Sequence, residues 1–233
     1  MNGEAAIVCQ NIGLKIRRKV ILNDVNFTIA RGQIAGLLGP NGAGKSSLMR
    51  ILTGMISPTQ GEAQVEGKRV GDETRGLTAY LPDRGKLPQS LTVGEWFAFA
   101  SVLYPDWDAK QAQMMMDVMQ VKWDSKMSTL SRGEEARVQL MTCLSRKAPF
   151  VILDEPFAGV DLISRERIAQ SVVGALADGE RTFLIATHDI REMEQLFDRA
   201  VFINCGRILG VEDAETLRTR GSSVESHYRE VFS

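Results

Sequence analysis

The first thirty residues alternate between short, β-prone apolar runs and turn residues. AAIVCQ (residues 5–10) and KVILNDVNFTI (19–29), with Arg31-Gly32 after them, predict two antiparallel strands. The next run, QIAGLLG (33–39), is almost entirely apolar and ends in glycine. A run of this kind indicates a buried strand that enters a tight loop.

A helix is predicted directly after that loop. Apolar residues recur there at helical spacing: Leu48, Ile51, Leu52 and Met55. The turn-rich segment ISPTQGEAQVEGKRVGD (56–72) favours a small hairpin, and TAYLP (78–82) favours another strand.

Residues from about 88 to 148 have a different pattern, with helical periodicity and few strand candidates. Three helices are predicted there, at residues 92–103, 109–120 and 131–146. The third begins with Ser131 and has Glu134 three residues later, the signature of a capping box. We therefore expect a mostly helical insert.

Beyond residue 148, short apolar runs again alternate with amphipathic stretches. Strands are predicted at FVILD (150–154), TFLIAT (182–187) and AVFINC (200–205), and helices at 162–178 and 189–197. This alternation is typical of a mainly parallel sheet covered on both faces. We expect an α/β fold forming a single domain over residues 1–233, with an N-terminal antiparallel β subdomain and a helical subdomain at about 88–148.

Composition narrows the possible functions. The charges of the 28 basic and 29 acidic residues nearly cancel. The chain therefore lacks the net positive charge that would favour binding to nucleic acid. Cys9, Cys143 and Cys205 are widely spaced and form no metal-binding pattern, which favours reduced cysteines in a cytoplasmic protein. We expect no secretory signal, and no uninterrupted apolar run approaches about 18 residues. A role at a membrane would therefore require a partner.

The loop after the first buried strand carries the strongest chemical signal. It matches G-x-x-x-x-G-K-[ST] with the residues Gly39, Pro40, Asn41, Gly42, Ala43, Gly44, Lys45 and Ser46, followed by Ser47. The glycines allow backbone N–H groups to surround a phosphate, and the helix N-terminus adds positive potential. Lys45 can reach the β- and γ-phosphates of a nucleotide, and the Ser46 hydroxyl can ligate Mg²⁺. A P-loop NTPase fold is expected.

Two adjacent carboxylates, Asp154 and Glu155, end the buried run FVILDE. In parallel sheets the carboxyl ends of the strands face the ligand crevice. Asp154 is therefore expected beside Mg²⁺, and Glu155 is placed to orient or deprotonate an attacking water.

The order of the motifs now becomes informative. The phosphate loop, LSRGE, FVILDEP, GVD and a lone histidine after a strand follow one another in a pattern that resembles the ATPase subunit of an ABC transporter. The resemblance covers nearly the whole chain. It implies ATP and Mg²⁺ as ligands and a head-to-tail pair of subunits that encloses two ATP molecules.

The resemblance also assigns roles to residues outside the phosphate loop. Ser131, Gly133 and Glu134 of LSRGE would contact the nucleotide of the second subunit, with Ser131 and the Gly133 amide at its γ-phosphate. Asp161 of Gly159-Val160-Asp161 would lie at the dimer interface, and His188 would sense the γ-phosphate.

Three positions depart from the family pattern. Ile16 takes the place of the usual adenine-stacking aromatic residue, so the selectivity for ATP is open. Asp83 matches the family's glutamine that links Mg²⁺ to the helical insert, and an aspartate is shorter and anionic. Arg132 replaces a glycine of the commoner LSGGQ.

The resemblance further implies an integral-membrane permease partner and a location on the inner face of the cell membrane. YPDWD (104–108) and LSRGEEARVQL (130–140) are most similar to ATPases of antibiotic- and bacitracin-resistance exporters. Five aromatic residues of the insert are expected mainly in the subdomain core; the less favoured alternative is that at least two of them line a groove for the partner. They are Trp96, Phe97, Phe99, Tyr104 and Trp107.

Two alternatives stay open from the sequence. One is a nucleotide-binding regulatory subunit with little hydrolysis. The other is a soluble ABC ATPase without a transport role. Transport is favoured because the chain has one ATPase unit and lacks long coiled coils.

Overall fold

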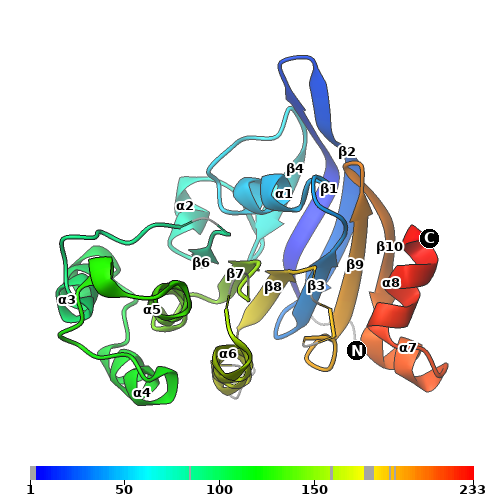
Figure 1. Cartoon of the computed structure of the whole chain (residues 1–233). Helices are drawn as coiled ribbons and strands as arrows, with labels where there is room; N and C mark the ends of the chain where they lie inside the picture. Colours follow the sequence, from blue (N-terminus) through cyan, green and yellow to red (C-terminus); the bar gives the residue numbers. More distant parts are fainter. Residues whose placement is uncertain (1–3, 84, 158–159, 176–180, 189, 192) are drawn as a thin grey trace.

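A computed structural model describes residues 4–83, 85–157, 160–175, 181–188, 190–191 and 193–233. The described chain contains a four-stranded sheet, a six-stranded sheet and helices around them (Figure 1). The mixed α/β class expected from the sequence is confirmed.

The four-stranded sheet is antiparallel, with the strand order β2-β1-β4-β5. It consists of β1 (Ala5–Ile16), β2 (Lys19–Ala30), β4 (Gln60–Val65) and β5 (Lys68–Arg69). Both the predicted strand pair and the predicted hairpin are confirmed. The end of the β1–β2 hairpin projects beyond the other elements at the top of Figure 1.

The six-stranded sheet has the order β10-β9-β3-β8-β7-β6. Its strands are β3 (Ile34–Leu38), β6 (Thr78–Leu81), β7 (Phe150–Asp154), β8 (Thr182–Ala186), β9 (Arg199–Asn204) and β10 (Arg207–Asp213). All pairings are parallel except that of β10 with β9.

The continuous apolar runs of this sheet are explained by burial on both faces. In β7, Val151 and Leu153 belong to one apolar core, and Phe150 and Ile152 belong to the other. Alternate residues of a strand point to opposite faces, so a strand with a core on each side has no polar face.

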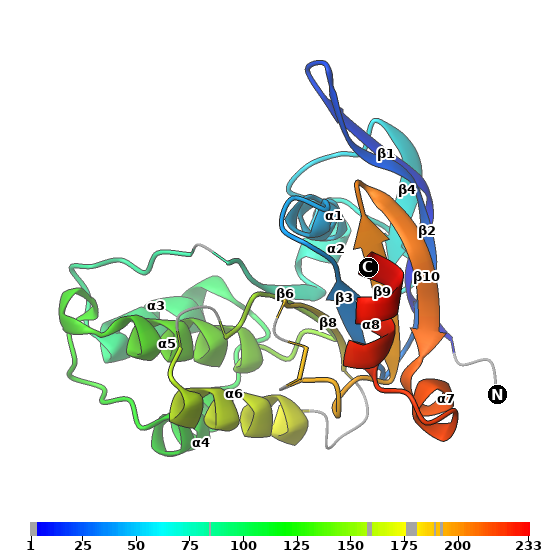
Figure 2. The ribbon, with the colours of Figure 1, turned by 45° about the vertical axis from the view of Figure 1, so that its right-hand side comes forward.

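The helices occupy different sides of this framework. They are α1 (Lys45–Leu52), α2 (Asp72–Arg75), α3 (Val93–Leu103), α4 (Ala109–Met119), α5 (Arg132–Leu144), α6 (Leu162–Ala175), α7 (Ala214–Thr219) and α8 (Val224–Phe232), with a short 3₁₀ turn, η1 (Met127–Thr129). Figures 1 and 2 show α3, α4 and α5 grouped on one side and α7 and α8 on the other.

The three helices predicted in the insert are confirmed as α3, α4 and α5. The division into one domain with a subdomain stays a prediction. The helix predicted at 189–197 was wrong for the described residues there, which form turns. The Ile190 carbonyl accepts hydrogen bonds from both the Met193 N–H, at 3.0 Å, and the Glu194 N–H, at 2.8 Å. One bond spans three residues and the other four, so the described residues form no regular helical ladder there.

Two C-terminal helices, α7 and α8, were not predicted, although the side chains of Asp213 and Ser223 cap them. Within the described residues, no helix combines the length and the apolar character that crossing a bilayer requires.

Candidate functional site

The parallel strands bring the predicted catalytic segments to one edge of the six-stranded sheet. Leu81 pairs with Leu153 in β6 and β7, and Asp154 pairs with Ala186 in β7 and β8. Ala186 in turn pairs with Leu37 of β3. The chain continues from these strand ends into Gly39, Asp83, Glu155 and His188. Residues far apart in the sequence therefore meet where the carboxyl ends of four strands lie side by side.

The glycines of the phosphate loop are required by the backbone path and by its close neighbours. Gly42 and Gly44 have φ values of 81° and 109°, in the left-handed region that favours glycine. A Cβ on Gly39 would lie 2.1 Å from the Ile203 carbonyl oxygen of β9. The loop is thus folded tightly against the sheet, with its backbone close to any bound group.

The helix that follows this loop begins without a side-chain cap. Gly44 is the N-cap of α1, no side chain bonds to it there, and the first turn has no acidic residue. Five other helices begin with a side chain that accepts a backbone N–H: Thr92, Asp108, Ser131, Asp213 and Ser223. The N-terminal N–H groups of α1 are therefore suited to an anion that supplies the missing acceptors.

Lys45 adds a cation to this loop. It is buried, and its Nζ donates to the carbonyl oxygens of Gly39 at 2.7 Å and Pro40 at 3.2 Å. Burial lowers its pKa, and the nearby carboxylates of Glu155 and Asp154 oppose that shift. An incoming polyphosphate would meet a positive charge that the loop already holds in place.

Asp154 lies beside Ser46 and Asp83 in an oxygen-rich environment. The pKa of Asp154 is raised mainly by burial; a hydrogen bond from Ser46 opposes this rise, and the charge of Asp83 adds to it. In the described structure, the Oδ1 atom of Asp154 is buried and has no hydrogen-bond partner. A buried carboxylate oxygen without a partner is well suited to a cation or to water bound to one.

These three residues fit Mg²⁺ by their chemistry. A hydroxyl and two carboxylates are hard oxygen ligands, as Mg²⁺ prefers. The described residues include no cluster of three or more His, Cys, Asp or Glu that would form a complete metal site. Mg²⁺ uses few protein ligands and completes its shell with phosphate oxygens and water.

Glu155 and His188 form a direct pair. The Nδ1 of His188 lies 2.8 Å from Oε2 of Glu155, and the backbone N–H of His188 donates to the same oxygen at 3.2 Å. Glu155 has a φ of 53°, and its N–H donates to the Ala186 carbonyl at 2.8 Å. The Glu155 side chain is largely buried, whereas His188 is exposed. The pair places an acceptor for a water proton beside a histidine at the edge of the site.

Ser131 is not part of this cluster. It lies at the start of α5, which packs on α3, α4, α6 and β6, whereas α1 packs on β2, β4 and β7. The capping box is formed: the Glu134 N–H donates to Ser131 Oγ at 3.3 Å, and the Ser131 N–H donates to Glu134 Oε2 at 2.8 Å. Ser131 and Arg132 are exposed, and Gly133 and Glu134 are partly exposed. The segment thus faces outward from its own subunit.

Two other predicted residues are exposed at the surface. Asp161 is exposed just before α6, and its carbonyl accepts from the Arg165 N–H at 2.9 Å. Its predicted neighbour Gly159 lies outside the described residues. Ile16 is 52% exposed near the end of the β1–β2 hairpin.

A hollow of about 400 Å³ adjoins the phosphate loop on the side of this hairpin. Leu22 links the two, because a Cβ on Gly44 would lie 2.8 Å from its Cδ2 atom. The lining includes Val20, Asn23, Thr59 and Gln60, and Ile16 is not among its residues. The sequence did not indicate these residues, since each lies in an ordinary strand or turn.

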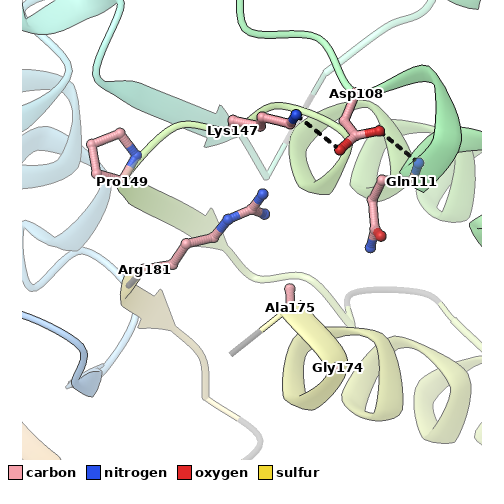
Figure 3. Close-up of a pocket in the computed structure, with 7 residues that line it drawn as sticks. All are labelled: Asp108, Gln111, Lys147, Pro149, Gly174, Ala175 and Arg181. Atoms are coloured by element: carbon pink, nitrogen blue, oxygen red, sulfur yellow. Dashed lines mark hydrogen bonds and ion pairs between the residues drawn. The ribbon is translucent and has the colours of Figure 1, made fainter. Parts of the chain in front are cut away.

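A second polar hollow, of about 380 Å³, lies away from the phosphate loop, between α4, α6 and the start of β8 (Figure 3). Lys147 pairs there with Asp108 at 3.4 Å, and Asp108 also accepts the Gln111 N–H at 2.9 Å. Asp108 is thereby engaged in capping α4, so this hollow contains no free acid–base pair comparable to that of Glu155 and His188.

Comparison with known proteins gives one family for this chain. A family model described as ABC transporter matches residues 22–158. The chain is 28% identical over 221 residues to the lipopolysaccharide export system ATP-binding protein LptB of Haemophilus influenzae, covering 90% of this chain and 91% of that protein.

A longer relative and a solved structure agree with this match. The ABC-type organic anion transporter ABCA8A of Mus musculus is 29% identical over 89% of this chain, but the chain spans only 13% of its length. A structure described as an ATP-binding subunit of an ABC transporter superposes with a TM-score of 0.87 at 24% identity, covering 98% of this chain and 100% of the other. The expected P-loop NTPase fold is confirmed by this likeness.

Proposed function

Because the chain belongs to the ABC transporter family, as an ATP-binding and ATP-hydrolysing member, we propose that it pairs head to tail with a second ATPase subunit and drives export through a separate membrane subunit. One observation carries the proposal: α1 begins with an uncapped anion site, and the exposed LSRGE segment begins a helix that packs elsewhere. Neither half alone surrounds a nucleotide.

In the proposed reaction, the backbone N–H groups of residues 42–47 and the Lys45 ammonium bind the β- and γ-phosphates of ATP. Ser46 and Asp154 would hold Mg²⁺, with Asp83 binding the ion or its water, and the bound ion supplies charge neutralisation at the phosphates. Glu155 accepts a proton from the water that attacks the γ-phosphorus. The bond to the β-phosphate oxygen breaks, and ADP and inorganic phosphate are released.

His188 shares the Glu155 carboxylate at 2.8 Å, which supports a role for it in holding that carboxylate or contacting the γ-phosphate. Ser131, the Gly133 amide and Glu134 of the second subunit would complete the contacts to the phosphate from the opposite side. The energetic reason is that preorganised donors stabilise the charge of the transition state. We therefore expect a single subunit to hydrolyse ATP slowly.

The docking site for the membrane subunit is proposed at the helical insert. A hollow of about 190 Å³ is lined by Trp96, Tyr104, Leu87 and Tyr80. Phe99, Val102 and Leu103 of α3 are exposed nearby in the sequence, at 53%, 86% and 51%. Phe97, by contrast, is buried between Trp107 and Trp123, with ring centroids 5.5 Å from each. The insert thus has aromatic residues both in its core and at its surface.

Export is the direction we propose, with the subunit on the inner face of the cell membrane. The relative from Haemophilus influenzae belongs to a lipopolysaccharide export system, which supports this direction. A closer kinship to antibiotic- and bacitracin-resistance exporters rests on YPDWD and LSRGEEARVQL alone.

The proposal is tested with Glu155→Gln in the purified full chain. Removal of the base should lower turnover by on the order of 100-fold or more while ATP binding persists. The trapped nucleotide should convert the chain from monomer to dimer when ATP and Mg²⁺ are added, as measured by light scattering after size-exclusion chromatography.

The matched control is the double variant Glu155→Gln/Ser131→Ala, which should bind ATP but dimerise less. Turnover of Glu155→Gln equal to that of the unsubstituted protein would show that the assigned base is wrong. Equal dimerisation of the double and single variants would contradict the role given to Ser131.

A further inference from the structure

The segment that follows His188 is attached to the two C-terminal helices. It runs from the end of β8 to the start of β9, and its described residues form turns. Figure 2 shows the described part of this stretch as a yellow-orange trace near α8. Three kinds of contact, made by different residues, join the segment to these helices. The attachment therefore does not depend on one interaction.

The first contact is charged. Glu225 of α8 accepts from Nε of Arg191 through both carboxylate oxygens, at 2.8 and 2.7 Å. Arg229, one turn later on α8, donates to Oε1 of Glu225 at 2.6 Å. Arg191 lies three residues beyond His188, so this ion pair is close to the histidine along the chain.

The second contact joins the segment to one end of each C-terminal helix. The Oε2 atom of Glu194 accepts the N–H of Glu225 at 2.9 Å and so supplements the Ser223 cap of α8. In the opposite direction, the Nη2 atom of Arg218 in α7 donates to the carbonyls of Glu194, Gln195 and Phe197, at 2.8, 3.4 and 3.2 Å. The segment thus gives an acceptor to the first turn of α8, and α7 gives a donor to carbonyls of the segment.

The third contact is apolar. Residues of the segment and of the two C-terminal helices belong to the same buried core: Ile190, Met193, Phe197, Leu217 and Val224. An exposed ion pair alone would stabilise little. Together, the ion pair, the shared apolar core and the hydrogen bonds to α7 and α8 hold the segment in its position.

We propose that α7 and α8 form a brace that sets the position of His188, with Glu225 and Arg218 as positioning residues for ATP hydrolysis. The inference rests on the proposed function, because His188 is taken as a participant in turnover. A change at the C-terminal helices would then alter the geometry of the Glu155–His188 pair without touching the nucleotide. The C-terminal helices would thereby become a point at which turnover can be regulated.

The test is the charge reversal Glu225→Arg in the full chain, which places a cation against Arg191 and Arg229. We expect kcat for ATP to fall about tenfold, as misplacement of a reacting group does, while the KM for ATP changes little. The matched control is Glu230→Arg, the same change on the same helix at a side chain that is 72% exposed and faces His227 at 3.6 Å. It should leave kcat unchanged.

Two further variants separate positioning from general damage to the fold. The double variant Arg191→Glu/Glu225→Arg restores opposite charges and should recover most of the lost kcat. In a His188→Ala background, Glu225→Arg should cause no additional loss. An equal loss with and without His188, or no recovery in the double variant, overturns the proposal.

A spectroscopic measurement makes the result independent of turnover. The chain has only two histidines, so the ring ¹H–¹³C signals of His188 are assigned by comparison with His227→Gln. Glu225→Arg should shift the His188 signal, and Glu230→Arg should shift only that of His227. An unmoved His188 signal overturns the brace. A brace detected in this way, in a protein that fails to hydrolyse ATP, would instead overturn the proposed function.

Discussion

Two helix N-termini in this chain carry the residues that we propose to bind phosphate, and they are built in opposite ways. The first turn of α1 has a glycine N-cap, no acidic residue and a buried lysine. The first turn of α5 has a serine N-cap, two acidic residues and a complete capping box. Both belong to motifs that the family places at the same phosphate. Of the two helices, α1 is the one whose first N–H groups have no side-chain acceptor and need one from a bound group.

The difference has an electrostatic consequence. The N-terminus of α1 combines helix dipole and ammonium in a buried place, where a polyanion is attracted most strongly. At α5, Glu134 already bonds to the Ser131 N–H and offsets the positive end of the helix. The α1 half-site is therefore expected to bind ATP by itself, whereas the α5 half-site is expected to contribute only after the first has bound.

The largest effect is expected from Lys45→Ala, which removes the cation of the α1 half-site. Hydrogen bonds to charged groups contribute about 1.5–3 kcal/mol, so the Kd for ATP should rise by about 10- to 100-fold. Isothermal titration calorimetry of the monomer measures this. An unchanged Kd would mean that the phosphates bind elsewhere.

Ser131→Ala at the other half-site should leave ATP binding to the monomer unchanged but lower turnover. Loss of the cap should also destabilise α5 by about 1 kcal/mol. Thr92→Ala removes the matching capping box of α3 and should cost similar stability without an effect on kcat. If both variants lower kcat equally, Ser131 acts only as a cap. Thermal unfolding and steady-state ATPase rates are compared.

The carboxylates Asp154 and Glu134 should change the free energy of unfolding in opposite directions as pH rises. Burial raises the pKa of Asp154, so the folded state binds its proton more tightly and loses stability as pH rises through that pKa. Asp154→Asn should therefore raise the free energy of unfolding at pH 7 while it impairs Mg²⁺-dependent turnover. Urea unfolding of the variant and of the unsubstituted protein at pH 5 and pH 7 tests this. A variant that is less stable than the unsubstituted protein at pH 7 would contradict it.

Glu134 should behave in the reverse way and more weakly. Its hydrogen bond from the Ser131 N–H lowers its pKa, so the stability it contributes is present above the usual glutamate pKa and is lost as pH falls through the folded value. Glu134→Gln keeps an acceptor for the capping box but should flatten this acid limb. A urea-unfolding series from pH 3 to pH 6 measures the difference.

The smallest effect is expected at Arg132, which is exposed and occupies the place of a family glycine. We predict that its side chain points away from the bound phosphate, so Arg132→Gly should change ATP-driven dimerisation of Glu155→Gln little. Clearly tighter dimerisation would show that Arg132 obstructs the phosphate, and weaker dimerisation would show that it provides a contact.

Much of the fold follows from local pattern. Buried strands such as β3 and β7 are continuous apolar runs, and α1 and α5 begin at recognisable loop or cap residues. A helix was wrongly predicted at 189–197 because the apolar residues there repeat at helical spacing. In the structure they pack into a core shared with β8, α7 and α8. Tertiary contacts there outweigh a short helix, which has little stability by itself.

Of the site, the sequence by itself determined the chemical groups: a glycine loop suited to a phosphate, a lysine, a hydroxyl, paired carboxylates and a capping box that starts α5. These depend on residue type and on spacing within a few positions. Only the tertiary structure decided that Glu155 meets His188, that Ser46 bonds to Asp154, and that the C-terminal helices hold the residues after His188. The physical reason is that such contacts join residues whose distance is set by strand order and packing, which no local spacing records.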